Sequence, residues 1–120
     1  MSSRFRVVSD AEKVLRGHLD DPITIAALSQ TVGVSERTLR NAFADVHRKS
    51  PKRYFLNQRL QSVRQALSDA GNKAATVTAV ATDYGFYELG RFALQYRALF
   101  GESPSETLRR HRMSPLSRAV

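Results

Sequence analysis

Cysteine is absent from the 120 residues, which excludes disulfide bonds and thiolate metal sites. No apolar run approaches the roughly 20 residues that a membrane-spanning helix needs. Residues 1–6 also lack the apolar core of a secretion signal. We therefore expect a cytoplasmic protein without a membrane partner.

Signatures of catalysis are missing as well. The sequence has neither a Gly-x-Ser-x-Gly nucleophile motif nor a phosphate-binding glycine loop. Its histidines, which are His18, His47 and His111, lie far apart and without metal-ligand spacing. We interpret each of them as a surface or helix-end residue, and we expect no enzymatic activity, no cofactor and no metal.

Acidic residues are scarce relative to basic ones. Eleven Asp and Glu stand against 19 Lys and Arg, which gives a formal net charge of +8. Such a balance favours an anionic partner, with nucleic acid first and an acidic membrane surface second. No stretch alternates apolar and polar residues as a strand does, so the expected fold class is all-α.

The clearest positive feature is an internal repeat, in which residues 27–33 are echoed by residues 79–85. The shift is 52 residues between Gly33 and Gly85. It is 53 residues at three later pairs: Leu39 and Phe92, Phe43 and Tyr96, Pro51 and Pro104. The second copy therefore has one extra residue just after its glycine. Each copy predicts a short helix, a tight turn and a second helix, which is the helix-turn-helix pattern.

Caps, prolines and apolar spacing predict seven helices. Ser9 and Glu12 form a capping-box pattern, so the first helix is expected from about Asp10 to His18. The second and third follow Thr24 and Ser35 as caps. The others are expected over about 51–70, 77–84, 88–100 and 104–112, the last with Ser103 as cap. The long fourth helix has an apolar stripe of Leu56, Leu60, Val63 and Leu67.

These elements predict two homeodomain-like helix-turn-helix subdomains joined by a long linker helix. The expected boundaries are a tail or linker remnant over 1–8, a first subdomain over 9–49, a linker helix over 50–70, a second subdomain over 71–112 and a tail over 113–120. About 20 helical residues span roughly 30 Å, close to the 34 Å of one turn of B-DNA. We therefore expect the second helices of the two subdomains to enter successive major grooves.

The outward faces of those two helices are the candidate base-reading sites. The third helix offers Arg37, Arg40 and Asn41; arginine can bond guanine O6 and N7, and asparagine adenine N6 and N7. The sixth helix offers a thinner set: Arg91 and Gln95 for hydrogen bonds, Leu94 for a thymine methyl, and Gly90 for close backbone approach. Its inward residues are expected to be Leu89, Phe92, Ala93, Tyr96 and Phe100.

Other cations are candidate contacts to DNA phosphates, which add affinity without direct sequence reading. In the first half they are Arg48, Lys49, Lys52 and Arg53; in the second they are Arg97, Arg109, Arg110 and Arg112. Arg59 and Arg64 of the long helix are expected to form salt bridges or to lie along its surface.

Residues 84–104 resemble the signature of the AraC/XylS family of bacterial transcription regulators. That signature has Gly-Phe, here Gly85-Phe86, then an aromatic, a basic stretch, a glycine at Gly101 and a proline at Pro104. Residues 24–51 resemble the first helix-turn-helix of the family, so the resemblance covers about residues 9–112. It implies a seven-helix domain, binding to promoter DNA, and activation by recruiting RNA polymerase.

By position, the resemblance assigns the family's base contacts to the seven base-reading candidates named above. The chain departs from the family where the second reading helix often carries a serine or threonine beside a basic residue, because Ala93 and Leu94 stand there. Most members also have an N-terminal sensing and dimerising domain. The basic start, with Arg4 and Arg6, resembles a linker end, so we expect a DNA-binding part without that domain.

Non-enzymatic alternatives remain at this stage. The run from Leu108 to Arg112 is basic and amphipathic, as in helices that bind a membrane surface or a protein. RNA binding is a further alternative, but the aromatics that could stack on single-stranded bases sit at core spacing.

Overall fold

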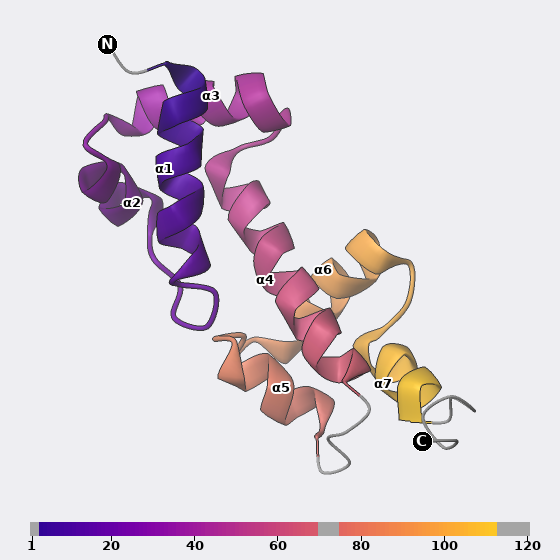
Figure 1. Cartoon of the computed structure of the whole chain (residues 1–120). Coiled ribbons are helices and arrows are strands. Elements are labelled where there is room, and N and C mark those ends of the chain that lie inside the picture. Colours follow the sequence, from indigo (N-terminus) through magenta and orange to yellow (C-terminus); the bar gives the residue numbers. More distant parts are fainter. Residues whose placement is uncertain (1–2, 70–74, 113–120) are drawn as a thin grey trace. The chain divides into compact units, whose positions relative to one another are not determined.

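The structure, a computed structural model, describes residues 3–69 and 75–112. The described residues form seven α-helices and no strand, which confirms the expected all-α class (Figure 1). The helices are α1 Arg4–Arg16, α2 Ile25–Val32, α3 Glu36–His47, α4 Pro51–Ser68, α5 Val77–Asp83, α6 Leu89–Phe100 and α7 Pro104–Arg112.

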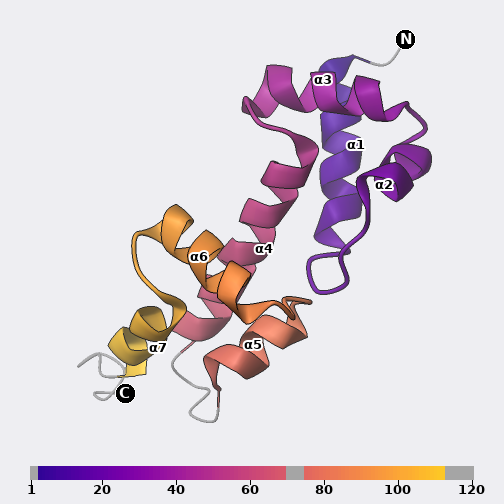
Figure 2. The same cartoon turned by 180° about the vertical axis from the view of Figure 1, so that it is seen from behind.

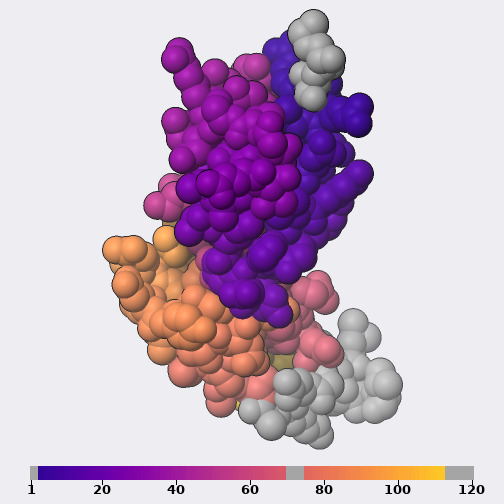
Figure 3. Space-filling model, turned by 90° about the vertical axis from the view of Figure 1, so that its left-hand side faces the viewer, coloured from indigo at the N-terminus to yellow at the C-terminus, as the bar shows by residue number. Residues whose placement is uncertain are grey.

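The chain divides into two compact units, Met1–Gln58 and Arg59–Val120. Helix α4 contributes its first half to one unit and its second half to the other. Figure 3 draws the first unit in indigo to magenta and the second in rose to yellow.

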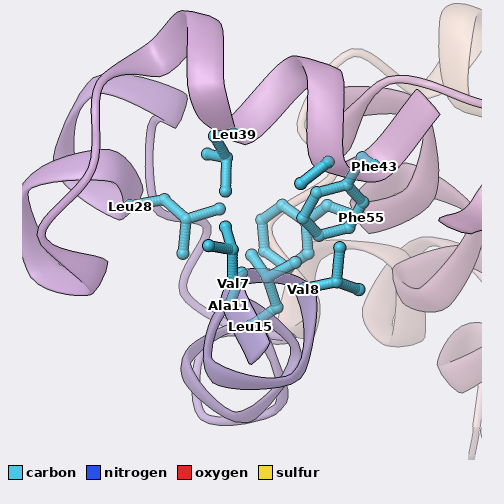
Figure 4. Packing of buried hydrophobic residues seen from close by; sticks show 9 residues of the cluster. Val7, Val8, Ala11, Leu15, Leu28, Leu39, Phe43 and Phe55 are labelled. Carbon is cyan, nitrogen blue, oxygen red and sulfur yellow. The ribbon is translucent and has the colours of Figure 1, made fainter. Parts of the chain in front are cut away.

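In the first unit, α1 packs against both α2 and α3. The residues between these helices form one apolar cluster, to which the start of α4 adds Phe55 (Figure 4). Its members are Val7, Val8, Ala11, Leu15, Leu28, Leu39, Ala42, Phe43 and Phe55. This core joins side chains from four helices, so it holds α3 against α1 with its polar side outward.

Helix α1 begins at Arg4, so the expected start at Asp10 and the expected tail over residues 1–8 are wrong for residues 4–8. Ser3 is the N-cap and accepts a bond from the Arg6 amide at 3.2 Å. The physical reason is burial, because Val7 and Val8 are only 4% and 1% exposed in the core. Glu12, expected in a capping box, instead accepts a hydrogen bond from the Tyr54 hydroxyl at 3.0 Å.

In the second unit, α5, α6 and α7 pack against one another (Figure 2). The buried apolar residues of this unit include Leu60, Val63 and Leu67 of α4, together with Ala75, Val80, Ala81, Phe86, Phe92 and Tyr96. Aromatic rings follow one another from the turn before α6 into that helix, with centroid distances of 4.9 Å for Phe86–Phe92 and 5.8 Å for Phe92–Tyr96. The inward side of α6 is therefore built mainly from aromatics.

Three further expectations need correction. Helix α4 ends at Ser68 and Asp69 is not helical, whereas the expected helix ran on to Ala70, which lies outside the described residues. Leu56 is only half-buried, because Phe55 takes the place in the first unit's core.

On α6, Leu89 and Ala93 are exposed although both were expected to face inward. Phe92 and Tyr96 alone fill the buried side of that helix, and Phe100 is half-buried. The exposed side is therefore wider than the apolar spacing indicated.

Candidate DNA-binding faces

The turn between α2 and α3 is built around Gly33, whose φ of 85° lies in the left-handed region. Its amide and that of Val34 both donate to the Ser29 carbonyl, at 2.9 and 3.0 Å. This pair of bonds is typical of a glycine-terminated helix end. The Ser35 hydroxyl then accepts a bond from the Thr38 amide at 3.1 Å and caps α3. The glycine-terminated end of α2 and the serine cap of α3 thus together determine where α3 begins.

Helix α3 separates two kinds of residue. Leu39, Ala42 and Phe43 are buried, whereas Arg37, Arg40 and Asn41, which we term the α3 face, are all exposed. Spacings of three and four residues bring Arg37, Arg40 and Asn41 onto one side of the helix. The structure thus places all three predicted base-reading residues together.

Arg40 lies 3.6 Å from the Glu36 carboxylate, an exposed pair at i and i+4. An exposed ion pair of this kind contributes little to stability. The guanidinium can therefore exchange Glu36 for another acceptor at small cost.

The second turn repeats the glycine conformation of the first and one of its two backbone bonds, whereas the Gly85 amide donates to Thr82 at 3.0 Å rather than four residues back. Gly85 has a φ of 82°, and the Phe86 amide donates to the Ala81 carbonyl at 2.9 Å, as Val34 does to Ser29. One residue, the N-cap Ser35, separates Val34 from α3, but both Tyr87 and the N-cap Glu88 separate Phe86 from α6. The extra residue of the second copy is therefore Tyr87.

Helix α6 presents Gly90, Arg91 and Leu94 on its exposed side, opposite buried Phe92 and Tyr96. Gln95, the fourth predicted base-reading residue of this helix, is half-buried at the border of that side. Arg91 lies 3.5 Å from the Glu88 carboxylate in an exposed pair. The Glu88 side chain makes no capping bond, so α6 starts without the hydroxyl cap that α3 has.

A buried hydrogen-bond chain ties α6 to α7. The Tyr96 hydroxyl donates to Thr107 Oγ1 at 2.7 Å, and the Thr107 hydroxyl donates in turn to the Glu102 carboxylate. Arg110 lies 3.0 Å from the same carboxylate. Burial raises the pKa of Tyr96, so its hydroxyl keeps the proton that it donates.

Arg59 supports the second turn in a way that the sequence reasoning missed. Its guanidinium donates to the Tyr84 carbonyl at 2.6 Å and lies 4.1 Å from the centroid of the Phe86 ring. Burial lowers the pKa of this guanidinium. Arg59 therefore holds the turn that precedes α6. No sequence signal distinguishes this arginine from the solvated ones.

An aromatic group at the end of α3 supports the first unit. The His47 and Tyr54 rings are stacked with centroids 4.4 Å apart, and His47 Nε2 lies 3.5 Å from the Glu12 carboxylate. Burial and the bond to Glu12 raise the pKa of Tyr54 to about 12. The group joins α1, α3 and α4 beside the predicted phosphate contacts. His47 is thus a helix-end residue, as expected, and is half-buried in this packing.

The predicted phosphate-contacting residues are all exposed: Arg48, Lys49, Lys52, Arg53, Arg97, Arg109 and Arg110. In the first unit they surround Ser50, whose hydroxyl accepts a bond from the Arg53 amide at 3.1 Å and caps α4. In the second unit Arg97 lies 3.8 Å from Glu106. Arg112, expected with this set, instead donates to the Ala75 carbonyl. The cations thus flank the exposed sides within each unit.

Over residues 3–69 and 75–112, no group of side chains has the composition and spacing to hold a metal ion. In the same part of the chain, no helix combines the length and apolarity needed to cross a bilayer.

A family model described as a helix-turn-helix domain matches residues 28–110. The XylDLEGF operon transcriptional activator of Pseudomonas putida is 40% identical over 104 residues, covering 87% of this chain and 31% of the relative. A probable thc operon regulatory protein of Rhodococcus erythropolis is 38% identical, covering 86% of this chain and 31% of the relative. The chain thus spans about a third of the length of these curated relatives.

Similarity to solved structures points to the same kind of protein as these relatives. A probable AraC family transcriptional regulator from Rhodopseudomonas palustris superposes with a TM-score of 0.81 at 40% identity, covering 88% of this chain and 97% of that chain. An AraC-type DNA-binding regulator from Chromobacterium violaceum gives a TM-score of 0.81 at 25% identity, covering 91% of this chain and 94% of that one. The sequence match, the repeated turns and the shared architecture establish that this chain belongs to the AraC/XylS family of helix-turn-helix transcriptional regulators.

Proposed function

We propose that the chain binds duplex DNA sequence-specifically and places α3 and α6 in the major groove to control a promoter. The observation that carries this proposal is the α3 face: two arginines and an asparagine stand exposed on a helix whose buried residues are all apolar. The major groove of B-DNA admits a helix, and each base pair presents a distinct pattern of donors and acceptors there.

Each base-reading residue has a defined role in this proposal. Arg37 and Arg40 bond guanine O6 and N7, and Asn41 bonds adenine N6 and N7. On α6, Arg91 and Gln95 donate to base edges, while Gly90 admits the DNA closely and Leu94 makes an apolar contact. The first unit thus contributes most of the hydrogen-bond readout.

The exposed cations beside these helices neutralise phosphates. In the first unit they are Arg48, Lys49, Lys52 and Arg53, and in the second Arg97, Arg109 and Arg110. Their contribution is independent of sequence and falls as salt rises, because binding releases counterions from the DNA. The exposed ion pair of Arg97 with Glu106 opens at little cost when a phosphate is offered instead.

The two units read two elements about one helical turn apart. The supporting observation is that α4 runs without interruption for 18 residues, or about 27 Å of helix, from one unit into the other. A single chain then covers two successive major grooves without dimerising.

The transcriptional outcome we propose is activation through recruitment of RNA polymerase in the cytoplasm. It is supported by relatives that are named as operon activators. Because the chain spans about a third of those relatives, sensing of an inducer is assigned to a further domain of a longer protein.

Selection of bound duplexes from a random pool at moderate salt, followed by sequencing, tests the proposal. Two short elements about 10 base pairs apart are expected. Enrichment of one element would restrict the second unit to phosphate contacts. Salt-sensitive binding with no enriched sequence would contradict sequence-specific reading. Competition with single-stranded RNA would then test RNA binding as the alternative.

A further inference from the structure

Tyr87 is the extra residue of the second helix-turn-helix, and its side chain is 77% exposed. The turn does not need it for closure, because in the first copy the residue after the glycine makes the corresponding backbone bond and the next helix begins one residue earlier. The buried residue of this turn is already Phe86, whose ring packs against the Arg59 guanidinium. Tyr87 therefore adds an exposed aromatic ring at the start of α6 without a packing role.

Leu94 is the second large apolar residue on this side, at 74% exposure. It stands four residues after Gly90, so the two share one side of α6. We refer to Tyr87, Gly90 and Leu94 as the α6 apolar face. Isolated exposed apolar residues are ordinary on protein surfaces. These, however, are the two most exposed large apolar residues described, and along the sequence they stand on either side of a helical glycine.

Gly90 itself has no structural reason to be glycine. A Cβ added there would meet no atom within 4 Å, and its φ is not positive. A glycine inside a helix costs about 1 kcal/mol relative to alanine. Gly90 thus weakens the helix but leaves its backbone bare at an exposed position, which suits a ligand that approaches the helix closely.

The chemistry of this face differs from that of the α3 face, which consists of hydrogen-bond donors and acceptors. In the major groove, the apolar feature of a base pair is the C5-methyl group of thymine. The chain's charge of +8, and Arg91 and Arg97 on the same helix, favour an anionic polymer as the partner. A methylated base edge is therefore the ligand that fits both the face and its surroundings.

We infer that the α6 apolar face recognises thymines through their C5-methyl groups, with Tyr87 and Leu94 contacting methyl groups and Gly90 letting the DNA approach the backbone. The inference rests on the proposed function, since it requires α6 to enter the groove. It adds that the second element is read by apolar contact and that Tyr87, the extra residue, determines specificity.

Deoxyuridine substitution tests this directly, because deoxyuridine pairs with adenine as thymidine does and lacks only the methyl group. The 120-residue chain is titrated with its selected duplex after the thymines of the second element are replaced by deoxyuridine. Affinity is expected to fall about fourfold for each contacted methyl, the loss expected for one buried carbon. The same replacement in the first element is the DNA control, with an expected change below twofold.

Protein variants assign the effect to the face. Leu94→Ala and Tyr87→Ala are expected to weaken binding to the thymine duplex and to reduce the deoxyuridine effect to below twofold. Leu99→Ala is the matched control, because Leu99 is a leucine of α6, 38% exposed, that lies outside the face. It is expected to leave the fourfold effect intact.

The outcomes separate the two proposals. Specific binding without a deoxyuridine effect, a second element without thymine, or an effect that persists in Leu94→Ala and Tyr87→Ala would each overturn the inference while sequence-specific binding stands. Absence of any preferred duplex would overturn the proposed function, and the inference with it.

Discussion

The two helix-turn-helix units share a frame but differ where their second helices begin. Both turns use a glycine with φ near 80° and a backbone bond that reaches five residues back. Helix α3 then starts with a serine cap and an acidic residue in its first turn. Helix α6 has Glu88 as an N-cap without a side-chain cap bond, and Leu89 and Gly90 are its first residues.

The difference teaches that the repeat preserves the core spacing and the turn, while the exposed chemistry of each unit diverges. The first unit has a well-capped helix with a polar face. The second has a poorly capped helix with an apolar face, and it is supported from elsewhere by Arg59 beneath the turn and by the Tyr96–Thr107 bond. Helix α6 is thus stabilised by contacts with α4 and α7 rather than by a cap in its own first turn.

The largest expected effect comes from comparing a buried leucine with an exposed one. Leu60→Ala should lower the free energy of unfolding by about 2–5 kcal/mol, because Leu60 is fully buried in the second unit. Chemical denaturation followed by circular dichroism measures the change. Leu94→Ala, which removes the same atoms from an exposed site, should change it by less than about 0.5 kcal/mol. Equal effects of the two substitutions would mean that the assignment of inward and outward sides is wrong.

The polar and apolar faces should differ in binding. Arg40→Ala should weaken binding to the selected duplex by about 1–3 kcal/mol and relax one base position, because a bidentate contact is lost. Titration with that duplex and repeated selection measure both effects. An unchanged affinity and sequence preference would remove Arg40 from the base-reading set. Gln61→Ala, an exposed change on α4 outside both faces, is the control.

The caps of the two helices offer a smaller contrast. Ser35→Ala should cost about 0.5–2 kcal/mol of stability, since it removes the bond to the Thr38 amide. Glu88→Ala should stay within about 0.5 kcal/mol, because Glu88 makes no cap bond. Thermal unfolding of both variants decides. A larger loss for Glu88→Ala would show that α6 depends on its own first turn after all.

Substitutions of glycine in the two units should have the smallest effects on stability. Gly90→Ala should raise stability by about 0.5–1 kcal/mol while weakening DNA binding, because alanine favours the helix but occupies the bare surface. Gly33→Ala should lower stability, since a φ of 85° strains alanine. Unfolding and DNA titration are measured on the same preparations. Gly90→Ala that binds DNA as tightly as the parent chain would mean that the DNA does not approach this residue closely.

The cap and turn signals allowed much of this fold to be predicted. Thr24 and Gly33 bound α2, Ser35 begins α3, and Ser103 with Pro104 begins α7, each as expected. The outward position of the α3 residues also followed from spacing alone. Whether those residues contact DNA stays a prediction.

By itself, then, the sequence determined the features that depend on neighbours within a few residues: the helical periods, the caps, the glycine turns, the repeat and the basic charge. The tertiary structure alone decided that α1 starts at Arg4, that Phe55 rather than Leu56 enters the first core, and that Arg59 supports the second turn. Each of these depends on contacts between segments distant along the chain. Burial of Val7 and Val8 outweighs a local capping pattern, because a cap contributes about 1 kcal/mol and a buried valine about 1.5 kcal/mol or more.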